Sequence, residues 1–81
     1  MGHKPRSRPQ HLGAKLLAIR GRLGMSQSQL GRALGFKKSF GRISEYENGG
    51  REPDLFILLQ YARLAKVTVE SLIDDNLDLH F

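Results

Sequence analysis

The segment 27–47 constrains the fold of this chain more than any other stretch, because helix-start and helix-stop signals alternate within it. Ser26 stands directly before it and Gln29 follows three residues later, which is the spacing of a capping box at a helix N-terminus. An apolar stripe with the period of one helix face comes next, formed by Leu30, Ala33 and Leu34. Gly35 can adopt the left-handed conformation that ends a helix. The first part of the segment is therefore predicted to be a helix over about 27–34.

The second part of the segment repeats these signals. Ser39 can cap another short helix, predicted over about 40–47, whose inward side consists of Ile43 and Tyr46. Gly31 carries no side chain, so the second helix can cross the first closely at that point. Two short helices joined by a turn in this way form a helix-turn-helix.

This segment and its flanks resemble the DNA-binding domain of the phage repressor/Cro or Xre-type family. The resemblance extends over roughly residues 12–75, and its specificity lies in the ordered set of short motifs rather than in any single one. The matching motifs are Leu23-Gly24-Met25-Ser26-Gln27, Leu30-Gly31, Leu34-Gly35, Ile43-Ser44, Tyr46-Glu47-Asn48-Gly49, Arg51-Glu52-Pro53 and Leu58-Leu59. The resemblance implies a compact all-α fold of five helices, with the helix-turn-helix at helices 2 and 3.

The turn between these two helices departs from the family pattern. Eight steps separate Gly35 from Ile43 in this chain, whereas the family usually has six. Lys37 and Lys38 are the expected extra residues. A longer turn leaves the tilt of the second helix open but does not change the motif.

The first helix is expected to start near Ser7, where Gln10 completes a Ser-x-x-Gln cap, and to run to about Leu23. Gly24 can end it in the left-handed conformation. Its apolar face consists of Leu12, Leu16, Ile19 and Leu23. Gly13 and Gly21 are each expected to destabilise this helix by up to ~1 kcal/mol.

Two more helices are expected in the second half of the chain. The fourth has Pro53 in its first turn, runs to about Leu64, and has Asp54 at its positive end, where an acid is favourable. Its core stripe is interpreted as Leu55, Leu58, Leu59 and Ala62. A short fifth helix follows Thr68, and its core contacts are expected from Val69, Leu72 and Ile73.

Turns and chain ends complete the expected layout. Asn48-Gly49-Gly50 predicts a turn before the fourth helix, and the resemblance implies a left-handed backbone at Lys66. Residues 1–7 are expected to be a flexible basic arm. Residues 8–75 are expected to form the helix-turn-helix domain, and residues 76–81 an acidic-apolar tail.

Size and composition exclude several function classes. A chain of 81 residues suits one domain, which buries only about 60–65% of its unfolded surface. It has no Cys, and its three His lie far apart, so neither a metal nor another cofactor is expected. No apolar run approaches the ~20 residues of a membrane span. No nucleophile–base set, acid pair or phosphate loop can be assembled, so an enzyme is not expected.

Charge is distributed unevenly along the chain. Residues 1–51 contain eleven Lys and Arg against two acids, whereas residues 52–81 contain two Lys and Arg against six acids. The basic half coincides with the helix-turn-helix and suits a polyanion, although a solvated basic face without a partner is the alternative. Basic side chains of the arm can follow phosphates or enter a minor groove, or merely aid solubility: Lys4, Arg6 and Arg8.

Base reading is expected from the outward face of the second helix of the motif. With its apolar residues inward, that face presents Phe40, Gly41, Arg42, Ser44 and Glu45. Arg42 alone is built for a bidentate contact to guanine. Phe40 can touch a thymine methyl or fold back into the core, and Ser44 can reach either type of base. Glu45 either accepts from a cytosine amine or pairs with a basic residue.

Phosphate anchoring is expected from groups around the motif. Gln27 lies where the backbone N–H groups of a helix start favour an anion, and the resemblance implies the same role for it. Further candidates for phosphate contacts are Lys37, Lys38, Asn48 and Arg51. For the two lysines, a solvated turn is the alternative.

The resemblance also implies a structural ion pair between Arg20 and Glu47, which both border the core. Separately, apolar residues stand where an exposed fourth helix would carry polar ones, and others occur in the tail. They are candidates for a dimer or partner surface, or for packing of the tail: Phe56, Ile57, Leu77, Leu79 and Phe81.

The main interpretation is sequence-specific binding of double-stranded DNA by a small bacterial transcriptional repressor, in the cytoplasm at the nucleoid. It is expected to act as a homodimer on a palindromic operator. The alternative is an antitoxin or adaptor-type interaction module that binds a protein partner, such as a toxin or a regulator, and whose helix-turn-helix is secondary. RNA binding is a weaker hypothesis, because exposed aromatic platforms for stacking bases are lacking.

Overall fold

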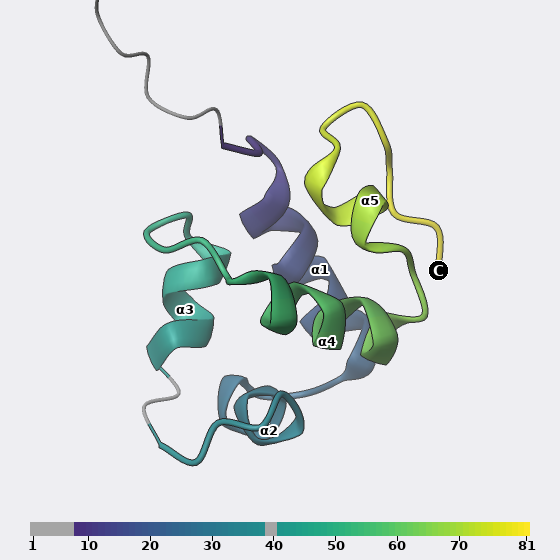
Figure 1. The fold of residues 1–81 in the computed structure, drawn as a ribbon. Coiled ribbons are helices and arrows are strands. Elements are labelled where there is room, and N and C mark those ends of the chain that lie inside the picture. The colour runs from purple at the N-terminus through teal and green to yellow at the C-terminus, as the bar shows by residue number, and fades with distance from the viewer. Residues whose placement is uncertain (1–7, 39–40) are drawn as a thin grey trace, which may run out of the picture.

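The computed structural model describes residues 8–38 and 41–81, and these residues form five helices and no strand. The helices are α1 (Leu12–Leu23), α2 (Gln27–Ala33), α3 (Gly41–Glu47), α4 (Leu55–Ala65) and α5 (Val69–Ile73) (Figure 1). The prediction of an all-α fold with five helices, and with a helix-turn-helix at the second and third, is confirmed.

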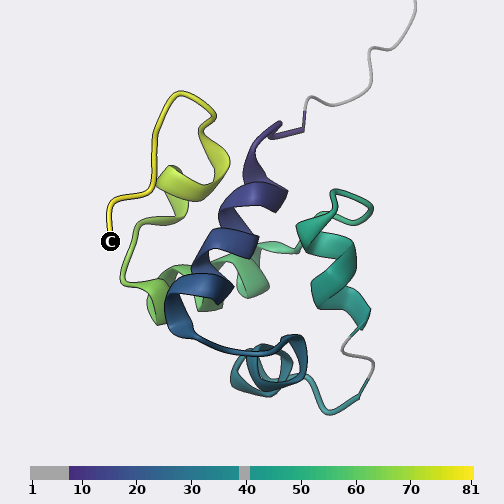
Figure 2. The same cartoon turned by 180° about the vertical axis from the view of Figure 1, so that it is seen from behind.

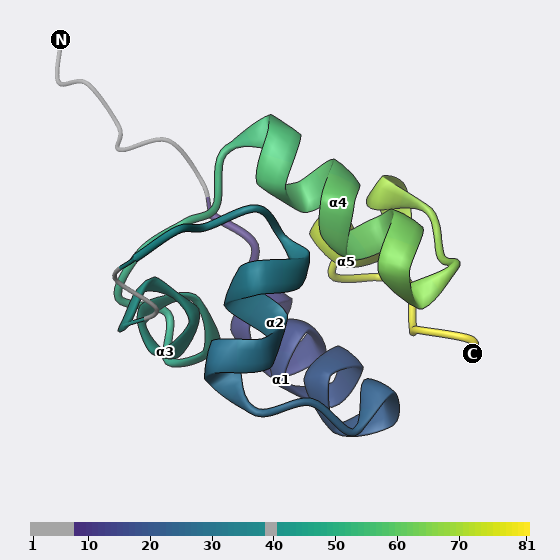
Figure 3. The same cartoon turned by 90° about the horizontal axis from the view of Figure 1, so that it is seen from below.

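α1 is the central helix of the fold. It lies between α3 on one side and α5 on the other, as the two opposite views show (Figures 1 and 2). α1 packs against α3, α4 and α5, while α2 packs against α3, and α4 against α5. Seen from below, α2 lies between α3 and α4 (Figure 3). Every helix contributes to one core, whose fully buried large side chains are Leu16, Ile19, Leu30, Ile43, Tyr61 and Leu72.

Helix ends follow the local signals in the sequence. Ser26 and Gln29 form the predicted capping box: the Gln29 N–H donates to Ser26 Oγ at 3.1 Å, and the Ser26 N–H donates to Gln29 Oε1 at 2.8 Å. Gly24 and Gly35 have φ values of 67° and 96°, as their predicted helix-ending role requires. Lys66 has a φ of 58° and ends α4 in the left-handed conformation, which confirms the expectation for this position.

The start of α1 differs from the prediction. The helix begins at Leu12 rather than near Ser7, which lies outside the described residues. The backbone N–H groups of Gln10 and His11 donate to the two carboxylate oxygens of Asp75, at 2.8 and 3.0 Å. The helix N-terminus is therefore capped by the C-terminal segment, and not by a residue of its own first turn.

Lys15 of α1 also binds the C-terminal segment, through hydrogen bonds from its side chain. Its ammonium group donates three hydrogen bonds of 2.7–2.9 Å to the carbonyl oxygens of Ser71, Asp74 and Leu77. Carbonyls at the C-terminal end of a helix have no partner within the helix, so a cation satisfies them well. The residues after α5 thus lie against α1, with Leu79 half-buried against the core.

The core face of α4 differs from the predicted stripe. Leu55 is 81% exposed, whereas Ile57 is only 7% exposed. Leu58 and Ala62 are buried as predicted, Tyr61 is fully buried, and Leu59 is half-buried. Because residues 55–59 are all apolar, their hydrophobicity alone does not define the rotation of the helix.

The start of α4 differs slightly from the prediction, whereas the start of α5 agrees with it. Pro53 precedes the helix rather than lying in its first turn, because Asp54 is the N-cap and its carboxylate accepts the Ile57 N–H at 2.9 Å. Thr68 caps α5 as expected, accepting the Ser71 N–H at 3.0 Å. Leu72 is buried in the core, whereas Ile73 remains largely exposed.

α1 lies very close to the end of α3 at Gly13. A Cβ atom at that position would lie 2.7 Å from the backbone oxygen of Glu47 and 3.0 Å from that of Tyr46. Gly31 in α2, where a close crossing was expected, is buried as well. Nothing lies within 4 Å of a Cβ added at Gly21, so only Gly13 of the two α1 glycines is required for packing.

Candidate functional site

α3 presents one face to the core and the other to solvent. Ile43 and Tyr46 are buried, and burial raises the pKa of Tyr46, so its hydroxyl stays protonated. The outward face carries three exposed residues and one half-buried residue, which are Gly41, Arg42, Glu45 and Ser44. Phe40, together with Ser39, lies outside the described residues.

Phe36 lies in the turn between α2 and α3 and contacts two residues of α3. Its ring centroid is 6.5 Å from that of Tyr46, with the rings tilted by 45°. The Arg42 guanidinium carbon lies 5.6 Å from the centroid of the Phe36 ring, within the range of a cation–π contact. The turn residue thus connects the buried face of α3 to its exposed face.

Arg20, Glu47 and Gln27 form a hydrogen-bonded cluster between α1, α3 and α2. Arg20 donates from Nε and Nη2 to the two Glu47 carboxylate oxygens at 2.7 and 3.1 Å, and the Gln27 amide donates to Glu47 Oε1 at 3.2 Å. The two side chains of the ion pair are 22% and 7% exposed. The hydrogen bond to Glu47 raises the pKa of Arg20 above its ordinary value. The pairing that the resemblance implies is present.

The remaining polar residues around α3 are accessible. Glu45 pairs with Arg51 at 3.4 Å, with both side chains about half exposed, so Glu45 has a basic partner on the surface. Asn48 is exposed, and its side-chain oxygen accepts the Gly50 N–H at 2.8 Å in the predicted turn. Lys37 and Lys38 are exposed in the turn between α2 and α3.

Neither a metal-binding cluster nor a membrane-spanning helix is present in the described part of the chain. No group of three or more His, Asp or Glu side chains there is arranged to hold a metal ion. Of the helices formed by residues 8–38 and 41–81, none has the length and apolarity needed to cross a membrane.

A helix-turn-helix family model matches residues 16–72, which is most of the chain. The chain belongs to the Xre-type helix-turn-helix family of DNA-binding transcription regulators. No curated protein sequence matches it. Among solved structures, it is similar to the P22 c2 repressor in complex with a synthetic operator, with a TM-score of 0.70 and 26% sequence identity. The similarity covers 79% of this chain and 94% of that one.

In this Xre-type chain, the described candidates for DNA contacts lie on α3, in the connections on either side of it, and at the start of α2. The outward residues of α3 lie beside the α2–α3 turn with its two lysines, and Gln27 begins α2. Asn48 and Arg51 follow the end of α3 in the next connection. The described members of both predicted sets are therefore on α3 or in segments that adjoin it, while Phe40 lies outside the described residues.

The apolar surface expected on α4 and the tail is only partly present. Ile57 is buried, so its assignment to a surface was wrong, because α4 is rotated to direct it into the core. Leu79 is half-buried against the core and belongs to the tail packing. Exposed positions remain at Phe56, Leu77 and Phe81, the last lying 5.3 Å beneath the Arg22 guanidinium.

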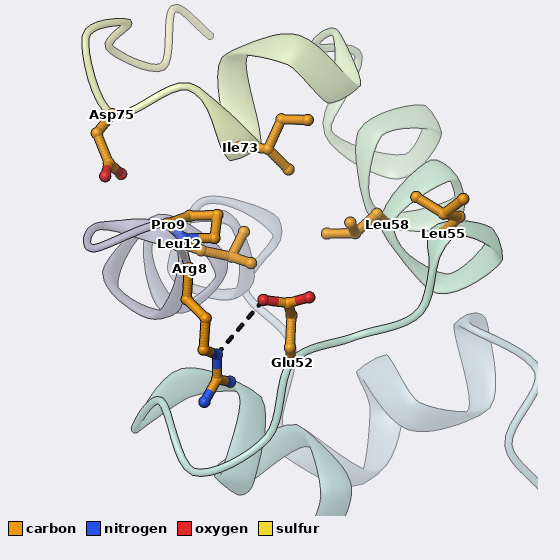
Figure 4. A pocket seen from close by; sticks show the side chains of 8 residues that line it. All are labelled: Arg8, Pro9, Leu12, Glu52, Leu55, Leu58, Ile73 and Asp75. Atoms are coloured by element: carbon orange, nitrogen blue, oxygen red, sulfur yellow. Dashed lines mark hydrogen bonds and ion pairs between the residues drawn. The ribbon is translucent and has the colours of Figure 1, made fainter. Parts of the chain in front are cut away.

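A shallow apolar pocket of about 430 Å³ lies beside the start of α4 (Figure 4). Its apolar wall consists of Pro9, Leu12, Leu55, Leu58 and Ile73. An ion pair of 3.4 Å between Arg8 and Glu52 lies at one side, and Asp75 at another (Figure 4). Two of the exposed large apolar side chains, Leu55 and Ile73, belong to this wall.

Three residues with clear structural roles were not recognised from the sequence. Asp75 caps α1 and Lys15 holds the segment after α5, but their partners lie more than fifty residues away in the chain. Phe36 carries the contacts with Arg42 and Tyr46. An aromatic residue directly after the helix-ending Gly35 was the only available signal for this last role.

Proposed function

We propose that this chain binds double-stranded DNA sequence-specifically and acts as a small transcriptional repressor, as a dimer on a two-fold symmetric operator. The observation that carries the proposal is the similarity to a repressor solved on its operator, at 26% identity over most of both chains. The exposed, basic surroundings of α3 support it. Such a regulator would act at the nucleoid, in the bacterial cytoplasm.

Base reading is assigned to the outward face of α3. Arg42 is exposed and has the fork of donors that matches the O6 and N7 atoms of guanine. Ser44 and Gly41 lie on the same face, and Phe40 next to them remains a candidate for a thymine methyl. Glu45 pairs with Arg51 in the free protein, so a role at a cytosine requires that exposed pair to open, which costs little.

Phosphate anchoring is assigned to Gln27 and the neighbouring cations. One proton of the Gln27 amide is donated to Glu47, which leaves the second available for a phosphate oxygen. Lys37 and Lys38 are exposed beside α3, and Asn48 and Arg51 follow its end. These contacts would fix the register of α3 in the major groove without reading sequence.

The dimer surface is assigned to the apolar pocket beside α4 together with Phe56, which is 64% exposed. A two-fold interface uses the same patch on both copies, so it needs a projecting group and a recess on one surface. Phe56 supplies the projecting group, and the pocket with Leu55 in its wall supplies the recess. Phe56→Ser should lower the dimer fraction in sedimentation, whereas Leu17→Ser on the outer face of α1 should leave it unchanged.

The proposal is tested by selecting bound duplexes from a random-sequence DNA pool at two salt concentrations. An enriched palindrome, bound far more tightly than bulk DNA, is the expected result. Sequence-blind binding that weakens steeply with salt would refute the repressor assignment, because it would show phosphate contacts alone.

A second candidate function is an antitoxin or adaptor module, which the same apolar patch favours. Its pocket and exposed leucine suit a protein partner as well as a second copy. Sedimentation of the purified chain separates the two uses. The module is favoured if the chain stays monomeric both on DNA and at high concentration. It is favoured further if the chain forms a stoichiometric complex with a protein encoded by a neighbouring gene.

A further inference from the structure

The Phe36 side chain is fixed in place on more than one side. Its backbone N–H donates to the Gly31 carbonyl oxygen at 2.9 Å, which ties the residue to the end of α2. Its half-buried ring packs against the core and against the ring of Tyr46, which is itself buried in α3. The position of this ring is therefore set by both helices of the motif, although the turn that it begins is two residues longer than the family usually has.

The exposed side of the same ring lies under the Arg42 guanidinium, 5.6 Å from the guanidinium carbon. A guanidinium carries five N–H donors in one plane, so its attraction to a ring leaves several of them available to other partners. Those in-plane donors are the ones that contact guanine O6 and N7. The contact thus restricts the rotamers of a long, exposed side chain, and the five donors of the guanidinium leave a pair for a base even where one of them hydrogen-bonds Tyr46.

We propose that Phe36 is a positioning residue for sequence recognition, which holds Arg42 ready to contact a guanine in the major groove. The inference rests on the proposed function, since it assigns the orientation of the base-reading Arg42 to a residue that does not itself contact DNA. It also gives the longer turn a consequence, because Phe36, at the start of that turn, contacts both Tyr46 and Arg42 of α3.

The test compares Phe36→Leu, which keeps an apolar packing group without a ring, with Phe36→Tyr, which keeps the ring. The readout is the specificity ratio, defined as the affinity for the selected duplex divided by that for a scrambled duplex. An exposed cation–π contact corresponds to a loss of about 2- to 5-fold in this ratio for Phe36→Leu. Phe36→Tyr should retain the ratio. Binding to the scrambled duplex should stay unchanged in both.

A double-mutant cycle separates positioning from a general structural role. In an Arg42→Ala background, Phe36→Leu should have no further effect on the ratio, because the side chain through which it acts is gone. An equal loss in both backgrounds would show that Phe36 merely supports the fold. Thermal melts identify variants that are partly unfolded. In the free protein, the Arg42 Hδ protons should show an upfield ring-current shift that Phe36→Leu removes and Phe36→Tyr keeps, and an absent shift would overturn the inference.

Failure of the inference is distinguishable from failure of the proposed function. If the wild-type chain selects a sequence and Arg42→Ala loses it, but Phe36→Leu does not change the ratio, only the positioning role is refuted. If the wild-type chain selects no sequence, or keeps its selectivity in Arg42→Ala, the base-reading role of Arg42 is refuted together with the inference.

Discussion

The Arg20 guanidinium and the Glu47 carboxylate form two hydrogen bonds, of 2.7 and 3.1 Å, which join α1 to the end of α3. Glu47 is almost fully buried, so its charge depends on this partner and on the Gln27 amide. The pair thereby connects the central helix of the core to the two helices of the motif.

Arg20→Ala should destabilise the domain by about 3 kcal/mol, because it leaves the Glu47 carboxylate buried without its cation. The lower end of the range for buried pairs is expected, since the Arg20 side chain keeps 22% of its surface exposed. Urea denaturation measures the loss. Arg63→Ala, an exposed cation on α4, is the control and should change stability by less than about 0.5 kcal/mol. An unchanged midpoint for Arg20→Ala would contradict the pairing.

Asp75→Asn should weaken the domain at neutral pH but not in acid. The N–H groups of Gln10 and His11 lower the pKa of Asp75 below its ordinary value of 3.8. The carboxylate is therefore charged more readily in the native state than in the unfolded chain. Its contribution to stability is complete above pH 3.8 and is lost as the pH falls through the lowered native pKa.

The measurement is the difference in urea midpoint between wild type and Asp75→Asn at pH 7 and near pH 2. This difference should shrink in acid, since both chains then lack the charged cap. Asp78→Asn, in the tail that follows Asp75, should show almost no difference at either pH. A difference for Asp75→Asn that is independent of pH would show that charge plays no part in the cap.

Gly13→Ala and Gly21→Ala should shift stability in opposite directions, although both add a methyl group to α1. At Gly13 the methyl would meet the Glu47 backbone oxygen at 2.7 Å, so α1 and α3 must separate, at a cost of about 1–3 kcal/mol. At Gly21 the methyl meets no atom within 4 Å, and the better helix propensity should stabilise by about 0.5–1 kcal/mol. Thermal unfolding of the two variants checks the contrast, and equal shifts would contradict it.

Tyr61→Phe should leave the domain as stable or make it more stable, by up to about 1 kcal/mol. The Tyr61 side chain is fully buried, and its hydroxyl has no hydrogen-bond partner among the described residues. Burial raises the pKa of this hydroxyl, so it stays neutral. Removing an unsatisfied buried donor removes a desolvation cost. A clear loss of stability in chemical denaturation would instead indicate a bound water that satisfies the hydroxyl.

Replacing Lys37 and Lys38 together by alanine should weaken DNA binding by a similar factor on all sequences. Each lost phosphate contact lowers the slope of log affinity against log salt by about 0.9, so a change of nearly 2 is expected if both lysines bind phosphates. Titrations at several salt concentrations measure it. Arg63→Gln, near the C-terminal end of α4, removes a charge away from the motif and should leave the slope nearly unchanged.

The helix ends that depend on neighbouring residues were predictable from the sequence. The Ser26–Gln29 box, the glycine after α1 and the Thr68 cap each involve groups within four residues of one another. Their conformations are decided by short-range sterics and hydrogen bonds, which a sequence pattern describes. The Arg20–Glu47 pair was available only through the family resemblance, since the two residues are 27 positions apart.

Long-range contacts account for what was missed. The start of α1 was placed too early because Asp75, some 64 residues away, supplies the cap. The apolar run at 55–59 offers several faces with similar hydrophobicity, and only packing against α1 and α5 selects the one that buries Ile57 and exposes Leu55. Arg42 is a comparable case: its hydrogen-bond donors made it identifiable from the sequence, but its cation–π contact with Phe36 did not follow from the sequence.

The sequence by itself determined the five-helix order, the helix-turn-helix, most helix ends and the basic character of the N-terminal half. These properties follow from local propensity, periodicity and composition, which need no knowledge of distant residues. Only the tertiary structure decided the rotation of α4, the cap of α1, and the partners of Glu45 and Arg42. Each of these depends on which surfaces meet in space, and on which buried polar group then requires a partner.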